Sequence, residues 1–136
     1  YKDRSIVISG DTTPSAHVLR EAKGVDVLIH EAMSMDFMKL LQETAEEAKR
    51  VNLSRILKDI TNYHTSPVQA AEIAQQAQVS YLLLNHISPP LPFPGLVSIF
   101  LKGTDEIFKG KIQVAKDGDF LSLPAGKKTI ETGHRF

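Results

Sequence analysis

Short apolar runs alternate with amphipathic stretches over residues 5–88 of the chain. Three of the runs predict buried strands, at Ser5–Ser9, Val25–Ile29 and Tyr81–Leu84. The stretches between them place apolar residues at helical spacing, with charged residues in the gaps. Strands that alternate with helices in this way predict an α/β domain.

The helical stretches carry boundary signals of their own. Thr13 stands before Pro14 as a capping hydroxyl, and Asn52 is placed to cap a later helix. Ser66 and Gln69 fit a capping box around a proline at the first helical position. The expected helices cover residues 14–23, 36–50, 53–60 and the stretch that begins at 67.

The last third of the chain has a different pattern. Four prolines, which exclude regular structure across a rigid loop, stand at Pro89, Pro90, Pro92 and Pro94. Leu96–Leu101 fits a helix or a strand. Lys111–Ala115 and Asp119–Leu123 flank a Lys-Asp-Gly turn, which predicts a hairpin. A terminal hairpin beside parallel strands predicts a mixed sheet.

Composition narrows the function classes. The 136 residues suit one domain, and 16 basic side chains balance 16 acidic ones, so no global field attracts nucleic acid or a membrane. Zero cysteines exclude disulfides, thiolate zinc sites and cysteine nucleophiles. The apolar runs are too short to cross a membrane. We expect a cytoplasmic protein.

Polar side chains follow the three predicted strands. Asp11, the pair His30-Glu31, and His86 come after these runs, and His64 comes just before a predicted helix. In open α/β sheets, ligands bind beyond the carboxyl ends of the strands and near helix N-termini. We therefore expect Asp11, Glu31, His64 and His86 to converge on one site.

These side chains suit metal-assisted or acid–base chemistry. Carboxylate oxygen and imidazole nitrogen are common ligands of hydrolytic zinc, and a carboxylate beside an imidazole orients it as a proton donor. A purely structural role remains open for three of these residues. Asp11 would then serve only as a turn or helix-cap residue, His86 as a polar side chain satisfied by its neighbours, and His30 as a donor to a backbone carbonyl. His17 and His134 fit surface positions.

Four segments together resemble a known family. They are Ser9-Gly10-Asp11-Thr12, VDVLIHEA ending at Ala32, HTSPVQAAEIA from His64, and LLLNHIS ending at Ser88. In order and spacing they resemble the C-terminal half of the metallo-β-lactamase fold, in the ribonuclease Z branch and its uncharacterised metallohydrolase relatives. The tail GKIQVAKDGDFLSLP is similar to that branch's final hairpin. The resemblance implies half of an αββα sandwich, with a mixed sheet flanked by helices.

The resemblance also implies roles for single residues. Asp11 matches the aspartate that bridges two metal ions, and His86 matches a ligand of the second ion. Glu31 matches a glutamate that pairs with a catalytic histidine, here His64, which helps to protonate the leaving oxygen. The implied cofactors are two divalent metal ions, with zinc first and manganese or iron as alternatives.

Three departures from the family pattern bear on the substrate. The family's HEAT reads HEAM at His30–Met33, and its HST reads HTS at His64–Ser66. The apolar, proline-rich stretch Ser88–Pro94 stands where a basic or aromatic pair is common. These changes weaken the case for transfer RNA processing as the specific activity.

The family's HxHxDH metal-binding motif does not occur in the sequence. We expect residues 1–136 to form a single domain or half-domain, the C-terminal part of a hydrolase, inactive alone. The substrate class would be a small-molecule ester or a phosphodiester, including RNA, and the resemblance implies a homodimer. The alternative is a non-catalytic half-domain that completes a fold or assembly with a partner chain.

Overall fold

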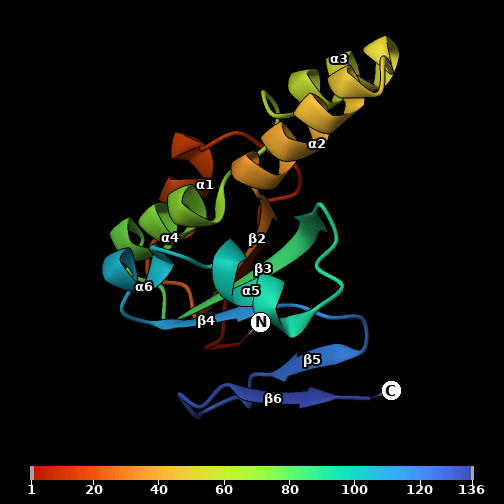
Figure 1. The fold of residues 1–136 in the computed structure, drawn as a ribbon. Coiled ribbons are helices and arrows are strands. Elements are labelled where there is room, and N and C mark those ends of the chain that lie inside the picture. The colour runs from red at the N-terminus through yellow and green to blue at the C-terminus, as the bar shows by residue number, and fades with distance from the viewer. Residues whose placement is uncertain (1, 136) are drawn as a thin grey trace.

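The computed structural model describes residues 2–135 (Figure 1). In chain order the elements are β1 (Ile6–Ile8), α1 (Ala16–Glu21), β2 (Val27–Met33), α2 (Met35–Glu47), α3 (Val51–Ile60), α4 (Pro67–Gln76), β3 (Tyr81–Ser88), α5 (Pro94–Phe100), α6 (Thr104–Ile107), β4 (Lys111–Val114), β5 (Asp119–Ser122) and β6 (Glu131–His134). The alternation of strands and helices confirms the predicted α/β class.

The main sheet has four strands in the order β1-β2-β3-β4, and each neighbouring pair is parallel. The prediction of a hairpin between residues 111–115 and 119–123 is wrong, because β4 joins this sheet beside β3. The antiparallel hairpin pairs β5 with β6 in a separate two-stranded sheet. The main sheet is therefore parallel, and the mixed character expected of it is absent from residues 2–135.

One face of the main sheet is covered by helices. Figure 1 places α1 and α4 on this face, with α4 across β2 and β3. The α4 surface that meets the strands is built from small residues, Ala70, Ala71 and Ala74, which are fully buried. They pack with Leu28 and Leu82 in the larger hydrophobic cluster. Small side chains let this helix approach the sheet closely.

The opposite face is only partly covered. Val27, Tyr81 and Leu83 form a second cluster, and side chains of the hairpin segment pack against it. The Arg4 guanidinium forms an ion pair with Asp26 at 3.1 Å and donates to carbonyls in the β5–β6 connection. This contact ties the start of the chain to the hairpin.

The N-terminal caps of two helices differ from those that the sequence predicts, and α1 and α2 are shorter than expected. Ser15, not Thr13, caps α1 by accepting from the amides of His17 and Val18. Arg50 precedes α3 without a side-chain cap, so Asn52 lies inside that helix. The capping box of Ser66 and Gln69 is confirmed, with both of its hydrogen bonds formed. The ambiguous segment after the prolines is helix α5.

Helices α2 and α3 form a hairpin that projects beyond the sheet (Figure 1). They pack chiefly on each other, and their buried side chains are Met38, Ala45 and Ser54. No helix among residues 2–135 combines the length and the apolar character that crossing a membrane requires.

Candidate active site

Two strands that hold site residues are longer than the sequence predicts. β2 continues through His30 and Glu31 to Met33, and β3 continues through His86 to Ser88. Glu31 and His86 therefore lie inside strands rather than after them. Asp11 lies three residues beyond β1, at the same edge, because parallel strands share their carboxyl ends.

A β-bulge sets the direction of the His86 side chain. Glu31 pairs with Asn85 and Ala32 pairs with Ile87, so His86 is the extra residue of β3. Its φ is 44°, in the left-handed region that few non-glycine residues adopt. Bulges redirect side chains, and they recur beside active sites. Here the bulge leaves the imidazole of His86 57% exposed beside Asp11.

Glu31 is the centre of a buried hydrogen-bond network. Its side chain is 1% exposed, and its Oε2 accepts from Nδ1 of His64 at 3.2 Å, as the sequence predicts. Its Oε1 accepts from the backbone N–H of Thr65 at 2.7 Å and from that of Thr12 at 3.5 Å. Ser9 Oγ accepts from the backbone N–H of Glu31. These contacts orient the carboxylate toward His64.

Thr65 is a site residue that the sequence analysis missed. It is fully buried, and its Oγ1 donates to the carbonyl of Thr12 at 2.6 Å, which joins the β1–α1 loop to the start of α4. The available signal was its place between His64 and the helix cap Ser66. Its amide also lies at the positive end of the α4 dipole, which favours the Glu31 carboxylate.

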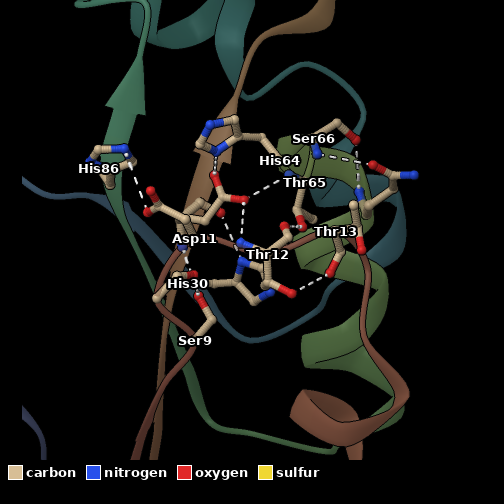
Figure 2. Close-up of polar contacts among 12 residues, drawn as sticks. Ser9, Asp11, Thr12, Thr13, His30, His64, Thr65, Ser66 and His86 are labelled. Carbon is tan, nitrogen blue, oxygen red and sulfur yellow. Dashed lines mark hydrogen bonds and ion pairs between the residues drawn. The ribbon is translucent and has the colours of Figure 1, made fainter. Parts of the chain in front are cut away.

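Three potential metal ligands converge at this edge. Asp11, His64 and His86 each offer one ligand atom, and these atoms all lie within 4.8 Å of one another. The Oδ1 of Asp11 is 3.6 Å from Nε2 of His86, too long for a good hydrogen bond, whereas ligands on one tetrahedral zinc lie about 3.3 Å apart. Figure 2 shows the three side chains approaching from three segments. One carboxylate and two imidazoles fit a zinc-like ion.

The rings of His64 and His86 lie nearly parallel, with centroids 5.9 Å apart. The network holds Nδ1 of His64 on Glu31, so its Nε2 is the nitrogen left for a substrate or an ion. A carboxylate that fixes one imidazole nitrogen in this way is typical both of general acids and of metal-bound histidines. Geometry alone allows either role for His64.

The remaining histidines are structural or peripheral. His30 is fully buried, and its Nδ1 donates to the Glu31 carbonyl at 2.8 Å, which matches the backbone interpretation. Burial lowers the pKa of His30 below its usual range, and its Nε2 has no hydrogen-bond partner among residues 2–135. His17 and His134 are exposed, and His134 donates to Asp119 at 2.9 Å.

The amino-acid sequence is similar to those of curated ribonuclease Z proteins. The sequence matches no protein-family model. It is 31% identical over 117 residues to ribonuclease Z from Mycobacterium sp. (strain KMS), which covers 86% of this chain and 37% of that protein. Ribonuclease Z from Lactiplantibacillus plantarum is 32% identical over 127 residues, covering 93% of this chain and 35% of that protein. The chain spans about a third of the length of these curated relatives.

The fold of this chain is also similar to that of a solved structure. The metallo-β-lactamase fold protein YhfI from Bacillus subtilis superposes with a TM-score of 0.59 and 16% sequence identity. The alignment covers 96% of this chain and 41% of that one. The chain therefore has the fold of the C-terminal half of a metallo-β-lactamase domain and resembles the ribonuclease Z proteins in sequence.

Proposed function

We propose that this chain is the C-terminal part of a metal-dependent hydrolase that cleaves phosphodiesters, RNA among them. The observation that carries the proposal is the position of the Glu31–His64 pair directly beside Asp11 and His86. An oriented imidazole next to metal-type ligands suits the hydrolysis of a phosphate ester, because a metal can activate water while the imidazole protonates the leaving oxygen. The names of the relatives favour RNA over a small-molecule ester.

Each residue has a proposed role. Asp11 and His86 hold divalent metal, with zinc favoured by one carboxylate and one imidazole. Bound there, the metal would activate water and polarise a phosphoryl oxygen. His64 keeps its proton on Nδ1 through Glu31 and, in its protonated form, donates the Nε2 proton to the leaving oxygen. The Glu31 carboxylate stabilises the imidazolium that this step uses.

The site needs ligands beyond this chain. A dinuclear centre requires more donors than the three that converge among residues 2–135. The matched relatives are about three times as long as the segment that this chain spans. We infer that further ligands come from residues that precede this segment in the longer protein, and that the 136-residue chain alone holds metal weakly and does not turn over substrate.

The test compares two variants of the longer protein that contains this segment. Asp11→Ala should abolish both the metal content, measured by elemental analysis, and the hydrolysis of an RNA or model phosphodiester. The matched control Asp36→Ala changes an exposed aspartate at the start of α2 and should retain both. Full metal content and full activity in Asp11→Ala would exclude the proposed site.

The second candidate is a non-catalytic half-domain that pairs with another chain. It is favoured by the uncovered part of the sheet, where Ile6 and Ile8 of β1 are 48% and 65% exposed. An exposed strand edge with apolar side chains favours association. The two candidates separate on one measurement: the longer protein either hydrolyses a phosphodiester in a metal-dependent manner or it does not.

A further inference from the structure

The loop at residues 9–13, which carries Asp11, has no regular secondary structure of its own. It connects the end of β1 to α1 and contains Gly10 at a φ of 61°, in the left-handed region that glycine adopts without strain. The Asp11 side chain is 61% exposed, and its carboxylate lies 3.6 Å from Nε2 of His86. The position of this carboxylate therefore depends on what holds the backbone on either side of it.

Two anchors hold this loop, one on each side of Asp11. On one side, the backbone N–H of Ser9 donates to the backbone of β2 at 3.0 Å. On the other side, the carbonyl of Thr12 accepts from Oγ1 of Thr65 at 2.6 Å (Figure 2). The Thr12 amide adds a contact of 3.5 Å with Glu31, which is long for a hydrogen bond. The anchor that follows Asp11 therefore depends chiefly on one side-chain hydroxyl.

Thr65 is itself held by two neighbouring elements. Its backbone N–H donates to Oε1 of Glu31 at 2.7 Å, and its carbonyl accepts from the backbone N–H of Met33 at 2.9 Å. It directly precedes Ser66, the N-cap of α4, whose capping box is complete. Thr65 is also fully buried. A residue that a strand and a helix cap fix in this way can set the position of an irregular loop.

We propose that Thr65 is a positioning residue, whose hydroxyl fixes the Asp11 carboxylate where it binds metal together with His86. A ligand that is held in place before the ion arrives binds it more tightly, because less conformational freedom is lost on binding. This role rests on the metal-binding part of the proposed function and not on its hydrolytic step.

The two polar groups of Thr65 act on different halves of the site. Its amide holds Glu31, which in turn orients His64. Its hydroxyl holds the loop of Asp11 through the Thr12 carbonyl. Removal of the hydroxyl alone should therefore loosen Asp11 and leave His64 in place.

The first test measures the mobility of the loop in the 136-residue chain by ¹⁵N relaxation. In wild type the amides of Asp11 and Thr12 should have order parameters of about 0.85, as in rigid backbone, and in Thr65→Val these should fall toward about 0.6. Thr65→Ser keeps a hydroxyl and should restore the wild-type values. If Thr65→Val does not fold, Thr65→Cys, which retains only a weak S–H donor, gives the same comparison. Unchanged order parameters in the variant that lacks the hydroxyl would overturn the proposal.

The matched control for this test is Thr104→Val. Thr104 is 2% exposed, and its Oγ1 donates to the carbonyl of Leu101 at 2.7 Å, so the control removes a similarly buried hydroxyl with a backbone acceptor. It should lower the urea midpoint as Thr65→Val does but leave the order parameters of Asp11 and Thr12 unchanged. Equal loosening of the loop by both variants would indicate general destabilisation and would also overturn the positioning role.

The second test measures zinc binding by the same chain, with the Asp11 amide and the His86 imidazole followed by NMR during a titration with zinc chloride. Thr65→Val should raise the apparent dissociation constant roughly tenfold, as the loss of a group that orients a metal ligand does. Thr65→Ser and Thr104→Val should keep the wild-type constant. The imidazole resonances of His64 before zinc is added should be the same in wild type and in Thr65→Val.

The possible failures of this test are distinguishable. A wild-type spectrum that zinc leaves unchanged would contradict the metal role of Asp11 and His86 in the proposed function, and the proposal with it. Zinc binding that is equally tight in wild type and in Thr65→Val would overturn only the positioning role. Shifted His64 resonances in Thr65→Val would assign the effect to the Glu31–His64 pair instead of the loop.

Discussion

The two halves of the candidate site differ in how completely this chain builds them. Glu31 is 1% exposed and accepts hydrogen bonds from His64, Thr65 and Thr12. Asp11 and His86, in contrast, are 61% and 57% exposed and lie 3.6 Å apart. The half that we propose to donate a proton is organised by residues of this chain, whereas the half that we propose to bind metal is open.

This difference follows from the origin of the contacts. The partners of Glu31 come from the β1–α1 loop and the start of α4, which pack together around β2. Asp11 and His86 are exposed at the carboxyl edge of the sheet, where their side chains point toward each other (Figure 2). Deeply buried polar groups depend on their partners for stability, whereas exposed groups remain solvated and free to bind a ligand. Substitutions should therefore affect folding in one half and ligand binding in the other.

The largest expected effect is on turnover. In the longer hydrolase that we propose, His64→Ala should lower the rate of phosphodiester hydrolysis by roughly 10²–10⁴-fold, as loss of a general acid does, and leave the metal content nearly intact. Steady-state kinetics and elemental analysis measure the two quantities. His17→Ala, at an exposed position on α1, is the control. Loss of metal from His64→Ala would instead assign His64 as the third ligand beside Asp11 and His86.

The next effect is on stability and compares the two carboxylates directly. In the 136-residue chain, Glu31→Ala should lower the free energy of unfolding by about 3 kcal/mol, because it leaves the buried Thr65 amide and His64 without their acceptor. Asp11→Ala should change it by less than about 0.5 kcal/mol, as is usual for exposed positions. Urea unfolding measures both.

The loss of unfolding free energy in Glu31→Gln should lie between those of Glu31→Ala and Asp11→Ala. The amide oxygen of the glutamine can still accept from Thr65, while the interaction with His64 changes. Glu72→Ala, at an exposed position on α4, controls for the loss of a carboxylate. Equal destabilisation by Glu31→Ala and Asp11→Ala would remove the distinction between the two halves.

The smallest expected effect is on pH dependence. Burial lowers the pKa of His30 in the folded chain, so the unfolded chain binds a proton more readily. The stability from keeping this ring neutral is present above the ordinary value of 6.5 and decreases as the pH falls below it. Urea midpoints measured on both sides of that value should show this decrease in wild type and a smaller one in His30→Gln. The control His17→Gln should show the same decrease of the urea midpoint as wild type. An equally large decrease in His30→Gln would assign the pH dependence to other groups.

Local signals were sufficient for much of the fold. The capping box at Ser66 and Gln69 involves residues three positions apart, and the pattern alone predicted it. The convergence of Asp11, Glu31 and His86 followed from the rule that parallel strands end at a common edge, and that of His64 from its place before a helix N-terminus at the same edge. Such features need only nearby residues or the fold class.

Features that depend on distant pairing were not predictable in this way. The turn at residues 116–118 favours a local hairpin, but β4 gains a place beside the buried β3, and β5 pairs with β6 instead. Likewise, no local pattern marks the bulge at His86, because the register mismatch exists only between β2 and β3. Thr65 became a site residue through Glu31, which lies 34 positions earlier.

The bulge at His86 has a consequence for how this site can be altered. Side chains alternate between the two faces of a strand, so an extra residue without a bulge would change the face of everything that follows it, whereas the bulge keeps Ile87 and Ser88 opposite Ala32 and Met33. Deleting position 86 would give β3 a continuous ladder with β2, with Asn85 still opposite Glu31 and Ile87 still opposite Ala32, but it would remove the imidazole from this edge. In β3, an uninterrupted hydrogen-bond ladder and an imidazole beside Asp11 therefore exclude each other. Substitutions leave the number of residues in β3 unchanged and preserve the bulge, whereas an insertion or deletion in β3 removes it.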